Sequence, residues 1–172
     1  REKLPEVDIS VTALETPPNL KRVPFDLCLF YCDSVPDNGI AFSGDELLPV
    51  CTPAPAKALK QPGDLKEAVC LTDTAWADDW RIWADEAMPG EGFAPRGPVF
   101  SLYALAVEEA LNGAGVLMAH RSLVADQLAA GTLVAPLAAV VPLQRQICLW
   151  TLPASRGKGA AGQVLQALRQ LG

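Results

Sequence analysis

The sequence predicts an α/β protein of two lobes joined by two crossovers. The main observation is a repeated unit of strand, capped helix, glycine and strand within residues 97–137, which is typical of parallel strands linked by helices. A second observation is the proline-rich segment 46–56, which suits a passage between lobes. Finally, a strand at 145–153 and an amphipathic helix at 161–171 return the chain to the first sheet.

Composition restricts the possible classes of protein. The chain has 172 residues, of which 50% are hydrophobic and 20% charged, so it can bury a core and is too apolar to be disordered. The net charge of −6 has the wrong sign for binding a nucleic-acid backbone. Apolar runs stay below the roughly 18 residues of a membrane span, and no leader is recognisable. We expect a cytoplasmic protein segment that contacts no membrane.

The N-terminal part contains three candidate strands. The sequence begins like the tail of a helix that leads into a first strand at about 7–13, and the apolar run 25–31, followed by a strong loop signal, predicts a second strand. The segment 46–56 carries a short third strand. Because prolines interrupt and end it, we expect no central, regular strand there.

A buried strand near 68–72 is followed by a tryptophan-rich helix. The residues at helical spacing are Trp76, Trp80, Trp83 and Ala87. We expect this aromatic face to pack the helix against a sheet; the alternative is that the tryptophans stack on a ligand. The acids on the same segment are expected on its solvated face, not as a general acid and base pair; they are Asp78, Asp79, Asp85 and Glu86.

The next helices have clear boundaries. After a short strand in 97–100, Ser101 is expected to cap one helix, and Ser122 the next, because a hydroxyl can bond the free amides of a first turn. Gly113 and Gly131 are suited to end these helices in the left-handed conformation. A strand at 115–119 lies between them.

The sequence contains few residues or motifs suited to catalysis or metal binding. Five cysteines lie in apolar stretches and are expected to be buried, reduced thiols. The close pair Cys28 and Cys32 would be roughly 13 Å apart on a strand, too far to share an ion. Phosphate-loop, dinucleotide, nucleophile-elbow and zinc-protease motifs are absent from the sequence. We therefore expect no metal, no cofactor, no catalytic residue and no enzyme activity.

The sequence supports a ligand-binding pocket better than it supports catalysis or metal binding. His120, the single histidine, follows the strand at 115–119, and ligands in α/β folds bind at such strand ends. It is a structural histidine, a ligand contact or a catalytic base. Amides at the helix start near Ser101 offer an anion site. Hydroxyl groups at strand ends or helix starts belong to Thr16, Tyr31, Thr52 and Tyr103.

The motifs resemble a known family. Residues 97–137, GPVFSLYALAVEEALNGAGVLMAHRSLVADQLAAGTLVAPL, resemble the distal part of the effector-binding domain of LysR-type transcriptional regulators, especially the glycine-cleavage-activator and β-lactamase-regulator branch. Four upstream segments resemble further family segments in the same order: LPEVDISV, FDLCLFY, ELLPVCTPAPA and DDWRIWADEA. The resemblance runs from about Leu4 to Leu171.

The resemblance implies a type II periplasmic-binding-protein-like fold, with two α/β lobes and a ligand cleft between them. Lobe I would comprise 1–51 and 141–172, and lobe II 52–140. The family's first strand and the start of its first helix are expected to precede this chain. A small-molecule effector would act on an N-terminal winged helix-turn-helix, absent from this sequence, that binds promoter DNA. Such domains pair into homodimers or tetramers.

The family also implies an effector site. Carried over by position, its residues are Thr16, Tyr31, Thr52, Phe100, Ser101, Tyr103 and His120. The family often has an arginine where this chain has Phe30, and two small hydroxyl residues where Ser101 is followed by Leu102. These departures favour an apolar or aromatic ligand over a small anion.

Two other functions remain open. A solute-binding protein of a transporter shares the fold, and an upstream sequence with a leader would identify it, whereas a helix-turn-helix would identify a regulator. A small α/β enzyme is the other alternative, and turnover abolished by His120→Ala would support it.

Overall fold

The computed structural model describes residues 4–14, 16–37, 39–152 and 159–170. Contacts divide the chain into unit 1, residues 1–44 and 144–172, and unit 2, residues 45–143. The division falls at 44/45 and 143/144, whereas the division predicted from the sequence fell at 51/52 and 140/141. Strands β2 (Gly39–Val50) and β6 (Val141–Thr151) are the two segments that pass from one unit to the other.

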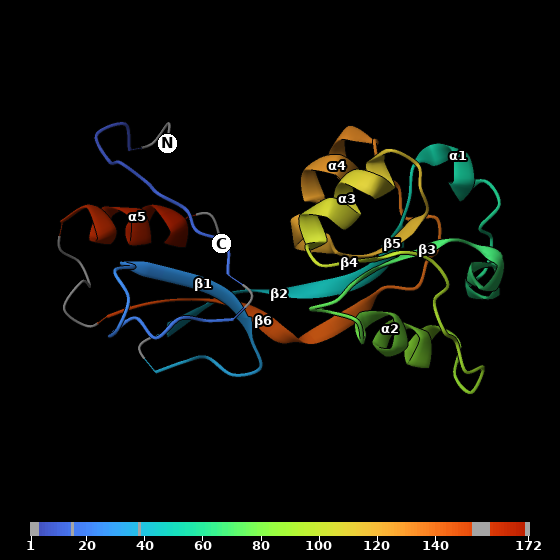
Figure 1. The fold of residues 1–172 in the computed structure, drawn as a ribbon, viewed down its shortest axis with the longest axis horizontal. Coiled ribbons are helices and arrows are strands. Elements are labelled where there is room, and N and C mark those ends of the chain that lie inside the picture. Colours follow the sequence, from blue (N-terminus) through green and yellow to red (C-terminus); the bar gives the residue numbers. More distant parts are fainter. Residues whose placement is uncertain (1–3, 15, 38, 153–158, 171–172) are drawn as a thin grey trace. The chain divides into compact units, whose positions relative to one another are not determined.

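Unit 1 contains strand β1 (Leu27–Cys32) and helix α5 (Gly159–Arg169). β1 pairs antiparallel with β6, and α5 lies over this pair (Figure 1). The strands predicted at 25–31 and 145–153 and the helix predicted at 161–171 are therefore confirmed, with ends shifted by a few residues. Residues 153 and 171, at the predicted ends of the last strand and helix, lie outside the described residues.

The predicted strand over 7–13 is wrong. These residues have no regular structure, and most of their side chains are exposed, with Val11 at 87%. Residues suited to a strand are not sufficient, because a strand also needs a neighbour for its backbone amides and carbonyls. None of the described strands pairs with this segment.

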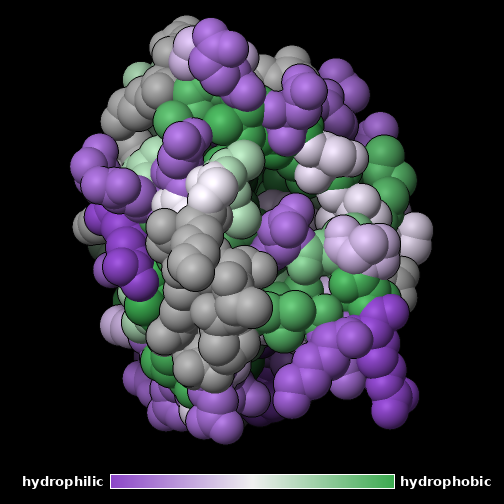
Figure 2. Space-filling model, turned by 90° about the vertical axis from the view of Figure 1, so that its left-hand side faces the viewer, coloured by the Kyte–Doolittle hydropathy of each residue, from purple (hydrophilic) through white to green (hydrophobic). Residues whose placement is uncertain are grey.

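Apolar side chains reach the surface of unit 1. The large ones that are exposed are Ile9, Val11, Leu14, Leu29 and Val35. Figure 2 shows hydrophobic side chains (green) interspersed with hydrophilic ones (purple) on the face it displays. Apolar groups distributed in this way are ordinary on a folded surface.

Unit 2 contains β3 (Cys70–Asp73), β4 (Val99–Phe100) and β5 (Val116–His120), together with the end of β2. The strand order is β1-β6-β2-β5-β3-β4. β3 pairs parallel with both β4 and β5, which confirms the predicted parallel strands, whereas β2 pairs antiparallel with β5.

Strand β2 contradicts the expectation drawn from its prolines. It runs through Pro49, which pairs opposite Met118, and it lies between β6 and β5 in the strand order. A proline deprives the ladder of one donor. The strand persists because its side chains from Leu47 to Val50 are buried, and because Cys51 and Val134 exchange two backbone hydrogen bonds beyond it. The short helix α1 (Pro53–Ala56) and a 3-10 helix, η1 (Pro62–Glu67), follow.

Helices cover both faces of the strands in unit 2. Figure 1 shows α3 (Tyr103–Leu111) and α4 (Ala125–Ala130) on one face and α2 (Asp79–Ala87) on the other. Alternation along β5 explains the arrangement, since Val116 and Met118 belong to the core under α2, and Leu117 to the core under α3.

The tryptophans follow the predicted packing in part. Trp80 and Trp83 are buried on α2, and their indole N–H groups donate to the carbonyls of Leu71 and Ala139 at 3.0 Å. This confirms them as packing residues. Trp76 instead lies in the turn before the helix.

The predicted serine caps are wrong, whereas the predicted glycine stops are confirmed. Helix α3 starts after Leu102 and α4 after Val124, and neither has a side-chain cap. Ser101 remains in a bend beyond β4, and Ser122 lies in the 3-10 helix η2 (Arg121–Leu123). Gly113 and Gly131, which follow α3 and α4, have φ of 81° and 71°, in the left-handed region.

Candidate functional site

A buried polar cluster lies in unit 2, at the carboxyl ends of β3 and β5. His120 ends β5, Asp73 ends β3, Asp79 begins α2, and Asp45 lies on β2. Their exposed fractions are 0% for His120, 2% for Asp79 and 6% for each of the other two. Since polar groups are buried only when they are paired or have a function, this cluster is the candidate site.

His120 lies between two carboxylates. Its Nε2 is 2.7 Å from Asp79 Oδ2, a hydrogen bond, and its Nδ1 is 3.6 Å from Asp45 Oδ2. The alternation of β5 places His120 on the same face as Met118, the face that α2 covers. When the ring carries both protons, it forms ion pairs with the two acids.

Strand register explains the position of Asp45. Leu47 pairs with His120, and moving two residues along each antiparallel chain places Asp45 opposite Ser122. Asp45 Oδ1 accepts the N–H of Ser122 at 3.0 Å and of Glu46 at 2.8 Å, while Oδ2 accepts the Ser122 hydroxyl at 2.5 Å. These bonds hold the carboxylate in place beside the imidazole.

Two aromatic rings border the histidine. The ring centroids of Trp76 and His120 are 4.1 Å apart, and Tyr103 meets Trp76 edge-on at 5.0 Å. The Tyr103 hydroxyl accepts the backbone N–H of His120 at 3.2 Å. Burial, helped by the negative charges of nearby acids, raises the pKa of Tyr103 well above its usual value, so the phenol remains neutral at physiological pH.

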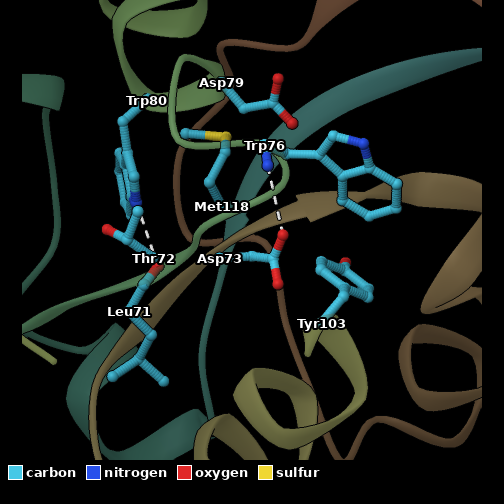
Figure 3. A pocket seen from close by; sticks show the side chains of 8 residues that line it. All are labelled: Leu71, Thr72, Asp73, Trp76, Asp79, Trp80, Tyr103 and Met118. Atoms are coloured by element: carbon cyan, nitrogen blue, oxygen red, sulfur yellow. Dashed lines mark hydrogen bonds between the residues drawn. The ribbon is translucent and has the colours of Figure 1, made fainter. Parts of the chain in front are cut away.

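Asp73 borders a small cavity beside this cluster. The cavity has a volume of about 10 Å³, and Figure 3 shows the side chains that line it: Leu71, Thr72, Asp73, Trp76, Asp79, Trp80, Tyr103 and Met118. Asp73 Oδ1 accepts the N–H groups of Ala75 at 2.8 Å and Trp76 at 3.2 Å. Its Oδ2 is buried and has no hydrogen-bond partner among the described residues.

Four of the sequence-predicted site residues belong to this cluster or lie around it. His120 is its centre, the Tyr103 hydroxyl accepts the backbone N–H of His120, and Phe100 pairs with Asp73 across the parallel strands β3 and β4. Ser101 follows Phe100 and is exposed.

The other three predicted residues lie elsewhere. Thr52 follows β2 beyond its pairing with β5, five residues from the position opposite His120, or roughly 16 Å along an extended chain. Thr16 and Tyr31 belong to unit 1, where Thr16 is exposed in a bend and Tyr31 is half-buried on β1 opposite Ile147.

Sequence reasoning missed the acids of the cluster. The expectation that Asp79 lies on a solvated face is wrong, although Asp78, Asp85 and Glu86 are exposed as expected. Asp79 precedes the buried Trp83 by four residues, so both share one helix face, and this spacing was the available signal. For Asp73, the signal was its position at the end of a strand.

The described residues offer no group of three or more His, Cys, Asp or Glu side chains arranged to hold a metal ion. Within the same residues, none of the helices has the length and apolarity needed to span a membrane.

Comparison with known proteins identifies the family. The sequence pattern of the LysR substrate binding domain matches residues 1–172. The chain belongs to the LysR substrate-binding domain family. It is thus the effector-binding domain of a LysR-type regulator, not an enzyme, as the motifs predicted.

Curated relatives agree with this assignment. The glycine cleavage system transcriptional activator of Escherichia coli K12 is 28% identical over 137 residues, covering 77% of this chain and 45% of the relative. The regulator DsdC of the same organism is 32% identical over 146 residues, covering 78% and 46%. This LysR-family chain therefore spans a little under half the length of these relatives.

Solved structures confirm the fold. The effector domain of the transcriptional regulator AmpR of Pseudomonas aeruginosa matches with a TM-score of 0.77 and 22% identity, covering 99% of this chain and 83% of that one. The predicted periplasmic-binding-protein-like α/β fold of the LysR effector domains is thereby confirmed. The family favours the regulator over a transporter component or an enzyme.

Proposed function

We propose that this domain binds a small-molecule effector at the carboxyl ends of β3, β4 and β5, and thereby controls DNA binding by the regulator that contains it. The observation that carries the proposal is the buried cluster around His120, which borders a cavity in a domain of the LysR family. A polar group buried beside a cavity at strand ends is a common arrangement for ligand binding in α/β folds.

The proposed contacts in unit 2 are Phe100, Ser101, Tyr103 and His120, since they surround one set of strand ends. Thr16, Tyr31 and Thr52 remain candidates from the family resemblance alone. Phe30 replaces an arginine common in the family, and aromatic rings border the cavity. The proposed effector therefore has an apolar or aromatic portion.

Effector binding would act through a difference in affinity for two conformations of the domain. The relatives are about twice as long and are named as transcriptional regulators, which supports a DNA-binding part outside this chain. We propose that the regulator works in the cytoplasm as a homodimer or tetramer and binds promoter DNA only through that part.

A thermal-shift screen of the full-length regulator tests the proposal. Amino acids, aromatic acids and cell-wall peptides are the panel, since a ligand that binds only the folded state raises the melting temperature. We expect at least one compound to raise it and to change operator binding, and the Tyr103→Phe variant to respond less. If no compound of any class affected melting or operator binding, the domain would not be a sensor of small molecules.

A further inference from the structure

The carboxylate of Asp73 is held in a way that leaves one oxygen available. Oδ1 accepts two backbone N–H groups, from Ala75 and Trp76, which fixes the orientation of the side chain. Oδ2 is buried, borders the cavity and has no hydrogen-bond partner among the described residues (Figure 3). Burying a charged oxygen without a partner is costly, so this atom is suited to a donor that arrives from outside.

The charges around the cavity indicate the sign of that donor. The two other buried acids, Asp45 and Asp79, both face the single imidazole of His120. The residues that line the cavity include no Lys, Arg or His. Two carboxylates, those of Asp73 and Asp79, therefore line the cavity with no basic side chain among the lining residues, and this local negative charge attracts a cation and repels an anion.

The walls of the cavity are also suited to a cation. Trp76 and Tyr103 line it, their ring centroids are 5.0 Å apart, and the two rings meet edge-on. An ammonium group within about 6 Å of such rings is attracted by their negative faces. Thr72, Trp76 and Tyr103 are only half-buried, which leaves this side of the cavity near the surface of the unit.

The volume of the cavity restricts which cationic group can enter it. A volume of about 10 Å³ is close to that required by one water molecule, and a primary ammonium is of similar size, whereas a guanidinium or a quaternary ammonium is larger. We infer that the effector of this domain carries a primary ammonium group, which donates a charge-assisted hydrogen bond to Asp73 Oδ2 beside the rings of Trp76 and Tyr103. This inference rests on the proposed function and names the chemistry of its ligand.

Calorimetry on the full-length regulator with paired probes tests the inference. Each primary amine is compared with the analogue in which a hydroxyl replaces the ammonium: alanine with lactate, phenylalanine with phenyllactate, and phenethylamine with 2-phenylethanol. Neutral and acidic compounds without an amine complete the panel. We expect binding by an amine, at least about tenfold weaker binding by its hydroxyl analogue, and a comparable loss in Asp73→Asn, because a hydrogen bond to a charged group is removed.

Asp73→Asn retains the oxygen that accepts the amides of Ala75 and Trp76, so the turn is preserved. The matched control is Asp85→Asn, which removes one negative charge from the exposed face of α2 and should leave amine binding unchanged. The comparison of amine with hydroxyl on the unmodified protein needs no variant and remains decisive if Asp73→Asn does not fold.

Two outcomes would overturn the inference, and they are distinguishable. If a compound without an amine bound the unmodified protein and Asp73→Asn equally, the domain would still be a sensor, but Asp73 would not select a cation, and water would be its natural partner. If no compound of any class changed melting or operator binding, the proposed function itself would fail, together with this inference.

Discussion

His120 Nε2 and Asp79 Oδ2 are 2.7 Å apart, although 41 residues separate them in the chain. The contact joins the end of β5 to the start of α2, and both side chains are almost completely buried. It therefore links a strand of the sheet to the helix that covers one of its faces.

We predict that His120→Ala lowers the free energy of unfolding by about 3–5 kcal/mol, because breaking a buried pair removes the hydrogen bond that His120 makes to the buried carboxylate of Asp79. The loss of ring contact with Trp76 adds to this effect. Urea denaturation followed by tryptophan fluorescence measures it. The control is Arg121→Ala, which removes a half-exposed ion pair with Glu46 and should cost about 0–1 kcal/mol. Equal effects of the two substitutions would contradict a structural role for the buried pair.

Gly97 allows β4 to approach β3 closely. A Cβ at this position would lie 2.2 Å from the carbonyl oxygen of Cys70, and its φ of 156° is one that side chains rarely adopt. The residues on either side of Gly97 make the hydrogen bonds to this part of β3: the amide of Cys70 donates to the carbonyl of Arg96, and the amide of Thr72 to that of Pro98.

We therefore predict that Gly97→Ala destabilises the domain by at least about 2 kcal/mol, because the backbone must move to relieve the clash. Gly63→Ala is the control: no atom lies within 4 Å of its added Cβ. It should change the unfolding free energy by less than about 0.5 kcal/mol. Thermal denaturation compares the two, and a Gly97→Ala protein as stable as the control would show that the strands can separate at little cost.

The buried thiols make the unfolding free energy depend on pH in the alkaline range. Four of the five cysteines are buried, as expected from their apolar surroundings, and Cys32 is half-buried. Burial raises the pKa of Cys51 and of Cys70 from 9.0 to about 11.

Between pH 9 and 11 the unfolded thiols have lost their protons while the folded ones retain them, so the unfolded state binds fewer protons and the unfolding free energy decreases as pH rises. Below pH 9 this contribution is fully present. Urea denaturation under reducing conditions across that interval should show the decrease. The double variant Cys51→Ala, Cys70→Ala should show a shallower slope, and an unchanged slope would exclude these thiols as its source.

Two serines expected to play the same role have different surroundings. Ser101 is exposed and caps no helix, whereas Ser122 donates its hydroxyl to the buried Asp45. We predict that Ser101→Ala changes the unfolding free energy by less than about 0.5 kcal/mol, and that Ser122→Ala costs about 1–3 kcal/mol because it leaves a buried acceptor poorly satisfied. Chemical denaturation measures both. Calorimetry with an identified effector then tests Ser101 as a contact, and unchanged affinity would remove it from the site.

The sequence by itself determined the type of most elements. Periodic apolar residues predicted α2, α5 and the strands β1, β3, β5 and β6, and left-handed glycines marked the ends of α3 and α4. The family motifs in their correct order determined the fold and the kind of protein. These signals are local, since helical and strand periods and turn chemistry are carried by neighbouring residues.

Only the tertiary structure decided which side chains meet. Nothing near residues 7–13 in the sequence reveals that none of the described strands pairs with them, and nothing near Pro49 reveals that burial and pairing on both sides sustain β2. The register of β2 on β5 brings Asp45 to Ser122, and the packing of α2 brings Asp79 to His120. Such contacts depend on burial and register between segments that are distant in the chain, so a solvated acid and a buried partner of histidine look alike in the sequence.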